Sequence, residues 1–213
     1  MTILRLVIFA ALALVSVAEV IDRVAVSVGK QIITAGQIDE EIRVTAFLNH
    51  EEPKFTVEEK KKAAERLIEQ ALIKDGMEKS HYPLPTLADA EPMVKLREDE
   101  YPGHEAFLAA LAQYGITPDV LRQHVWWQVT LLKFIDDRFR PAVQVSNAEI
   151  AQHYREQVQK WRDEGRSQIP TLQESRAAME RALIEERVDN ALDRWLGDER
   201  TRVDIRFRDG AFQ

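Results

Sequence analysis

The sequence has no cysteine among its 213 residues. This absence excludes a disulfide scaffold, a zinc knuckle, an iron–sulfur site, a catalytic thiol and a lipoprotein anchor. It also lacks a glycine-rich phosphate loop, a G-x-S-x-G elbow and an H-E-x-x-H motif. Only 8 glycines and 8 prolines are present, which excludes collagen-like and low-complexity chains. We therefore expect a globular protein with no cofactor and no metal.

Acidic residues outnumber basic residues in this chain. The chain carries 29 Lys and Arg residues against 36 Asp and Glu residues, a net charge of −7. Proteins that bind nucleic acid neutralise phosphates with clustered Lys and Arg, so this balance argues against nucleic acid as the main partner. Apolar residues make up 45%, enough for a core without covalent staples.

The N-terminus has the order of a secretory signal peptide. Arg5 is the only charge before Glu19, the apolar run 6–15 follows it, and small residues end the segment at Ser16 and Ala18. The run is shorter than the roughly 20 residues that span a bilayer. We expect residues 1–18 to be removed, leaving a periplasmic chain 19–213 with no stable membrane span. An uncleaved signal anchor is the alternative.

Both ends of the mature chain have the alternation of strands. Val24, Val26 and Val28 alternate with smaller residues, and Gly29 marks a hairpin turn before a second strand. The alternating segment 203–208 predicts a strand that pairs with this hairpin. The fold class predicted is mainly α, with a small antiparallel β element that joins the N-terminal hairpin and the C-terminal strand.

Helix starts are well marked between the strands. A hydroxyl residue precedes Glu or Gln by three positions at Thr34, Thr56, Ser146 and Thr171, the spacing of a capping box, and Pro118 follows Thr117. We predict helices over 35–49, 57–80, 87–100, 104–114, 118–139, 147–163 and 172–200. We also predict a core over 19–163, a linker over 164–170, and a closing helix and strand over 171–208.

The predicted helix 118–139 has two adjacent apolar stripes, which favours a central position packed on two sides. Trp126 lies off both stripes, so it is either covered by another element or exposed for a partner. The closing helix has one stripe, and we expect it to dock on the helices before Pro141. Its members are Ala177, Ile184, Val188, Ala191 and Trp195.

One pair has the spacing of metal ligands. Glu149 and His153 are four residues apart and share a helix face, but two ligands make an incomplete site. We favour a solvated ion pair for them.

Several segments resemble the SurA family of periplasmic chaperones in their order and spacing. The segment 21–34 is similar to the family's opening strand, turn and capped helix, and the LIEQALI run is similar to its next helix. Two further segments resemble parts of the family. FLAALAQYGI followed by TPDVLR is similar to a helix junction, and VSNAEI followed by HY is similar to the start of a further helix. The resemblance covers most of 21–155 and returns at 187–207.

The departure from the family is equally clear. Family members carry parvulin-type prolyl isomerase domains before the closing helix, whereas only residues 157–170 lie there in this chain. The resemblance therefore implies the chaperone core alone, which is an ATP-independent binding protein and not an enzyme. Its implied clients are unfolded polypeptides of outer-membrane proteins, held in an apolar crevice.

Two alternatives remain beside the chaperone hypothesis: a prolyl isomerase with an unrecognised site, and a structural subunit whose crevice is filled by a partner or by a homodimer. The sequence pattern places the client surface on large apolar residues near helix ends and on the polar arc of helix 118–139. We predict client contacts at Phe47, Leu48, Tyr114 and Trp126.

Overall fold

The computed structural model describes residues 22–208 and 210–212. The predicted signal peptide, 1–18, lies outside these residues. Within them the protein is mainly helical, with one small antiparallel sheet, as predicted. No helix in the described part of the chain combines the length and the apolar character that a membrane span requires.

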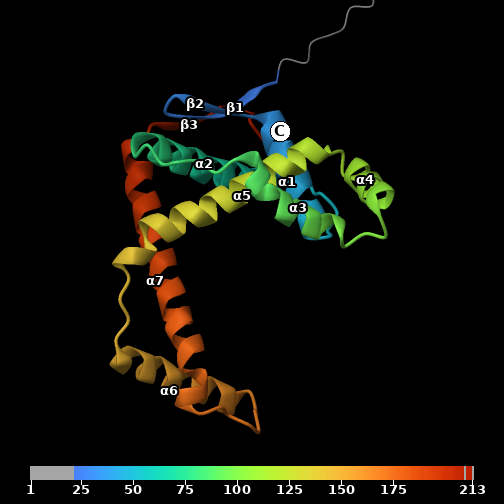
Figure 1. The fold of residues 1–213 in the computed structure, drawn as a ribbon. Coiled ribbons are helices and arrows are strands. Elements are labelled where there is room, and N and C mark those ends of the chain that lie inside the picture. Colours follow the sequence, from blue (N-terminus) through green and yellow to red (C-terminus); the bar gives the residue numbers. More distant parts are fainter. Residues whose placement is uncertain (1–21, 209, 213) are drawn as a thin grey trace, which may run out of the picture.

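The sheet ties the two ends of the chain together (Figure 1). Strand β1 (Val24–Val28) lies in the middle, between β2 (Gln31–Thr34) and β3 (Ile205–Phe207), and both pairings are antiparallel. Gly29 turns the hairpin with a φ of 57°, which glycine adopts without steric cost, and its N–H donates to the Asp204 carbonyl at 2.9 Å. The predicted pairing of the C-terminal strand with the hairpin is confirmed.

Most of the α-helices begin directly after a Ser or Thr whose side chain caps them. The α-helices are α1 (Ala35–Leu48), α2 (Val57–Lys79), α3 (Glu91–Glu98), α4 (His104–Gln113), α5 (Pro118–Arg138), α6 (Asn147–Asp163) and α7 (Leu172–Arg202), with short 3₁₀ segments η1 (Leu87–Ala90) and η2 (Arg140–Ala142). Reciprocal capping boxes form at Thr34, Ser146 and Thr171, where side chain and backbone satisfy each other's orphan N–H groups.

The predicted single helix 87–100 is two elements. Residues 87–90 form the 3₁₀ segment η1, and α3 starts only at Glu91, with Pro92 in its first turn. Proline has no N–H and disfavours helical backbone in the residue before it, so it suits a helix start and not a helix interior. Pro92 accordingly lies in the first turn of α3, where a missing N–H costs no helical hydrogen bond, although Glu91 before it already has helical backbone.

Helix α5 is the central strut. It borders two of the three apolar clusters, through Leu121 and Val125 in one and through Trp127 and Phe134 in another. Figure 1 shows α5 crossing the body between α1–α2 and α3. The central position predicted for this helix, packed on two sides, is confirmed, but Leu132, a member of one predicted stripe, is 64% exposed.

The C-terminal half of α7 docks on this body as expected. The Trp195 ring packs edge-on against Phe134 and Phe139, with centroids 6.1 and 6.0 Å away. A Cβ on Gly76 of α2 would lie 2.6 Å from the Trp195 ring, so glycine is required for this close approach.

The N-terminal half of α7 behaves differently. It projects from the body and packs against α6 (Figure 1). Ala177, predicted to belong to the docking stripe, is exposed, whereas Ser175 and Met179 are buried. The stripe is displaced because the partner here is α6, which approaches another face of the helix.

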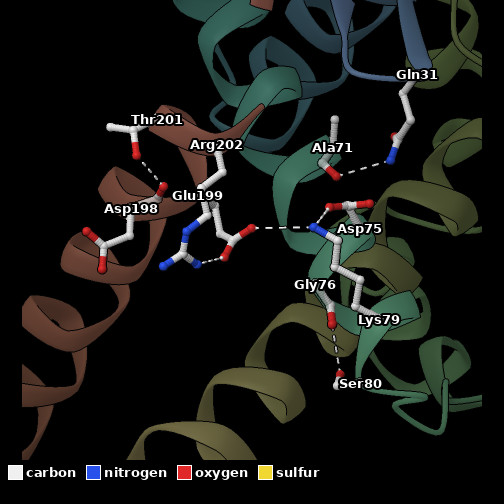
Figure 2. Close-up of polar contacts among 10 residues, drawn as sticks. All are labelled: Gln31, Ala71, Asp75, Gly76, Lys79, Ser80, Asp198, Glu199, Thr201 and Arg202. Atoms are coloured by element: carbon white, nitrogen blue, oxygen red, sulfur yellow. Dashed lines mark hydrogen bonds and ion pairs between the residues drawn. The ribbon is translucent and has the colours of Figure 1, made fainter. Parts of the chain in front are cut away.

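Hydrogen bonds and ion pairs connect the hairpin, α2 and α7 (Figure 2). The Lys79 ammonium lies 2.6 Å from an Asp75 oxygen and 3.7 Å from an oxygen of Glu199, a buried residue of α7. Glu199 also accepts from Arg202 at 2.8 Å, and the Gln31 amide donates to the Ala71 carbonyl at 3.2 Å. The two chain ends therefore converge on the C-terminal half of α2.

Candidate functional site

The loop that leaves α2 crosses toward α5. Tyr82 donates its hydroxyl proton to Asp137 at 2.7 Å and packs edge-on against Phe134 at 5.2 Å. Burial, with the Asp137 carboxylate as second cause, raises the pKa of Tyr82 to about 12, so the phenol stays protonated and keeps donating. The Trp126 indole then donates to the Pro85 carbonyl at 3.0 Å. These two bonds fix residues 82–85 beside α5.

An apolar hollow of about 350 Å³ opens between this loop, α2 and α5. We call it the tryptophan groove. Its main lining side chains are Lys74, Met77, Tyr82, Leu84, Trp126 and Trp127. Leu84 is 56% exposed at the edge, so its side chain is accessible to a ligand in the groove.

Lys74 separates the groove from its neighbour. The Lys74 ammonium lies over the Trp127 ring, 4.7 Å from the centroid, and desolvation lowers the pKa of Lys74. The long aliphatic stem of a lysine covers apolar surface while its charged end reaches toward water. Lys74 is thus one of three charged or titratable side chains, with Glu78 and His81, at the edges of a mostly apolar groove.

A second hollow, of about 190 Å³, shares Lys74, Trp126 and Trp127 with the tryptophan groove and extends to α1. Its far end is polar, because Glu41 lies there, buried between α1, α2 and α5. Arg66 donates to Glu41 at 2.7 Å, and the His124 ring lies 3.6 Å from the other Glu41 oxygen. Desolvation lowers the pKa of His124, and Arg66 acts in the same direction, against the opposing effect of Glu41.

A third hollow, of about 430 Å³, lies beyond this polar group. It shares Glu41, His124 and Trp127 with the second hollow and adds Ile73 and Leu131. Trp127, only 6% exposed, is therefore the one side chain that borders all three hollows. The three hollows lie in a row around Trp127, and only the tryptophan groove is predominantly apolar, because the other two have several charged and amide side chains in their walls.

The four predicted client residues have different environments. Trp126 lines the first and second hollows, and Leu48 lines the third. Tyr114 is half-buried, edge-on to Phe47 at 5.4 Å, and lines none of the three. All four belong to or pack against one apolar cluster, but only two of them reach a hollow.

Phe47 requires a correction. Its ring is only 2% exposed and packs against Tyr101, Phe107 and Tyr114. The last turn of α1 points into the body because α3 and α4 cover it, so Phe47 supports the core and is removed from the predicted client surface. For Trp126 the structure combines both alternatives, since the ring is half-buried and also lines a hollow.

Sequence reasoning missed Trp127, Leu84 and Tyr82. Trp127 lies on an apolar stripe of helix 118–139, which favours a buried position, and it is only 6% exposed. The loop 80–86 has no periodicity from which its contacts could be predicted. The one sequence signal that could have indicated an aromatic groove on this helix is the adjacent pair Trp126 and Trp127. Successive helical residues point about 100° apart, so two adjacent large rings on one helix cover a wide arc of its surface.

Glu149 is engaged away from His153. Its carboxylate accepts from the Ser146 backbone and hydroxyl and pairs with Arg187 of α7. The two Ser146 bonds, then Arg187, lower the pKa of Glu149 to about 2. Among residues 22–208 and 210–212, no group of three or more His, Asp or Glu side chains could hold a metal ion.

Comparison of the sequence with protein-family models and with curated proteins gives no match.

Proposed function

We propose that this protein is an ATP-independent chaperone that binds segments of unfolded polypeptide in the three hollows around Trp127. The observation that carries the proposal is the tryptophan groove, a concave and mostly apolar surface with Leu84 exposed at its edge. Apolar side chains of an unfolded chain would be buried there, and such burial is favourable without a specific sequence.

The free energies expected from burying apolar side chains in these hollows are small enough for reversible binding. Burying one Leu- or Phe-sized side chain contributes about 1.5–3 kcal/mol, less than the roughly 4 kcal/mol of a millimolar complex. Tight holding therefore needs several side chains in neighbouring hollows, as an extended segment would supply. A segment held by such weak contacts dissociates without nucleotide hydrolysis.

The resemblance to the SurA family supplies the rest of the proposal. It gives the periplasm as the compartment and unfolded outer-membrane proteins as the clients. Residues 164–171 form a short connection between α6 and α7. Tyr154 of α6 donates its hydroxyl proton to the carbonyl of Pro170 in this connection. A prolyl isomerase domain has no place in it, and we therefore propose binding and not catalysis.

The test is suppression of aggregation. Chain 19–213 should lower the light scattering of an outer-membrane protein diluted from urea. Leu84→Glu should weaken this effect, because it places a charge at the edge of the groove on a side chain that is already exposed. Leu108→Glu, on an exposed position of α4 outside the three hollows, is the matched control.

Two results would contradict the proposal, and a third would support the enzymatic alternative. Equal scattering with and without the chain would exclude chaperone activity. A stable dimer in solution, with Leu84→Glu converting it to a monomer, would identify a groove filled by a second copy. Faster cis–trans exchange of a prolyl peptide would instead support the enzymatic alternative.

A further inference from the structure

A separate hollow of about 510 Å³ lies where α5 ends beside α7. We call it the arginine hollow. Three arginines line it, together with apolar side chains from η2, the residue after it and α7. The residues that matter here are Arg138, Arg187, Arg194, Phe139, Val143 and Ala191.

The charge of this hollow is opposite to that of the protein. The chain as a whole carries −7, and each of the three hollows around Trp127 has at least one Asp or Glu in its lining. The same holds for the hollow between the hairpin and α2. No acidic side chain lines the arginine hollow, so its positive potential has no compensation within its own walls.

Only one of the three arginines has a carboxylate partner. Arg187 pairs with Glu149 and also donates to the Gln144 carbonyl. Arg194 donates through Nε to the Asn190 carbonyl at 3.0 Å, one turn back on its own helix. Within the described chain, neither Arg138 nor Arg194 forms an ion pair.

Arg138 is nevertheless held in place. Its guanidinium lies 5.8, 5.7 and 5.4 Å from the ring centroids of Phe134, Phe139 and Trp195. The nearby acids are committed elsewhere, since Asp136 pairs with Arg140 and Asp137 accepts from Tyr82. An ordered guanidinium loses little further freedom when it binds an anion.

The helix dipole explains part of this arrangement. Arg138 lies in the last turn of α5, where a cation is favoured by the carbonyl end of the helix. Arg194 lies well inside α7, where no such effect operates. Two unpaired guanidiniums over a wall of Phe139, Val143 and Ala191 therefore make a site for a ligand with both an anionic and an apolar part.

We propose that the arginine hollow binds an oxyanion carried on an apolar group, with Arg138 and Arg194 donating to the oxygens. A planar guanidinium fork matches a carboxylate in geometry and charge. The apolar wall would cover the carbon chain next to it. The ligand is thus an aliphatic carboxylate, either a free acid or a glutamate side chain flanked by leucines, and the proposal does not depend on the chaperone function.

The test titrates chain 19–213 with hexanoate and follows the Nε–Hε resonances of its arginines by NMR. The resonances of Arg138 and Arg194 should shift with hexanoate, and less with acetate, which lacks the carbon chain. Hexylammonium, with the same chain and the opposite charge, should shift neither. Acetyl-Leu-Glu-Leu-amide against acetyl-Leu-Gln-Leu-amide then distinguishes a polypeptide source from a free acid.

Variants assign the binding to the hollow. Arg194→Gln should weaken hexanoate binding about threefold to fivefold, the range of a partly exposed ion pair. Arg181→Gln is the matched control, because Arg181 makes the same contact with a carbonyl one turn back on α7 but lies outside the hollow. Equal affinity in the two variants, or no arginine shift with either hexanoate or the Glu peptide, overturns the proposal.

Discussion

The indole Nε1 of Trp126 donates a hydrogen bond to the carbonyl oxygen of Pro85, 3.0 Å away. This bond joins the middle of α5 to the loop that carries Leu84, so one side chain both forms the groove and positions its opposite edge. A large ring can thus be half-buried and still line a hollow.

Trp126→Phe separates these two roles. The substitution keeps an aromatic wall but removes the donor to Pro85, and the loss of one such bond should lower the free energy of unfolding by about 1 kcal/mol. Client affinity should fall as well, because the loop with Leu84 loses its attachment to α5. Urea denaturation and aggregation assays on the same preparation measure the two effects. A stable variant with unchanged chaperone activity would show that the bond is irrelevant to binding.

Trp195→Ala tests the docking of α7. The Trp195 ring packs on Phe134 and Phe139 and faces Gly76, so its removal leaves a cavity between α2, α5 and α7. We expect a loss toward the lower end of the roughly 3–5 kcal/mol that truncating a large core aromatic residue costs, because Trp195 is partly buried. Gly76→Ala should also destabilise, since its Cβ would lie 2.6 Å from the same ring. Near-wild-type denaturation midpoints in both variants would refute the docking.

The pKa of His124 predicts a pH dependence of stability. Burial lowers this pKa from 6.5, so between the folded and the unfolded value the unfolded chain binds more protons than the native one. Stability should therefore be highest above pH 6.5 and fall on acidification, until the folded imidazole also protonates. Denaturation at pH 7.5 and pH 5.5 measures the difference. In His124→Gln the loss between these two pH values should be smaller.

The sequence predicted the helices far better than the groove. Starts at Thr34, Ser146 and Thr171 follow from capping, which is a local interaction between residues three apart. The exposure of Phe47 and Ala177 depends on which distant helix covers them, and nothing local specifies that. The loop 80–86 lacks periodicity, and its position beside α5 depends on the bonds of Tyr82 and Trp126 to residues more than forty positions away.

A chain that ends at Glu164 tests the contribution of α7 and β3 together. Residues 19–164 would lack the strand that pairs with Val26 and Val28, and also the ring that packs on Phe134. The exposed edge of β1 and the uncovered cluster should make this fragment bind a hydrophobic dye and aggregate. Size-exclusion chromatography and dye fluorescence would measure both. Because the lost contacts are non-covalent, a separate peptide of residues 171–208 should restore a soluble complex. A truncated chain that is as soluble and as heat-stable as 19–213 would show that the body folds without α7.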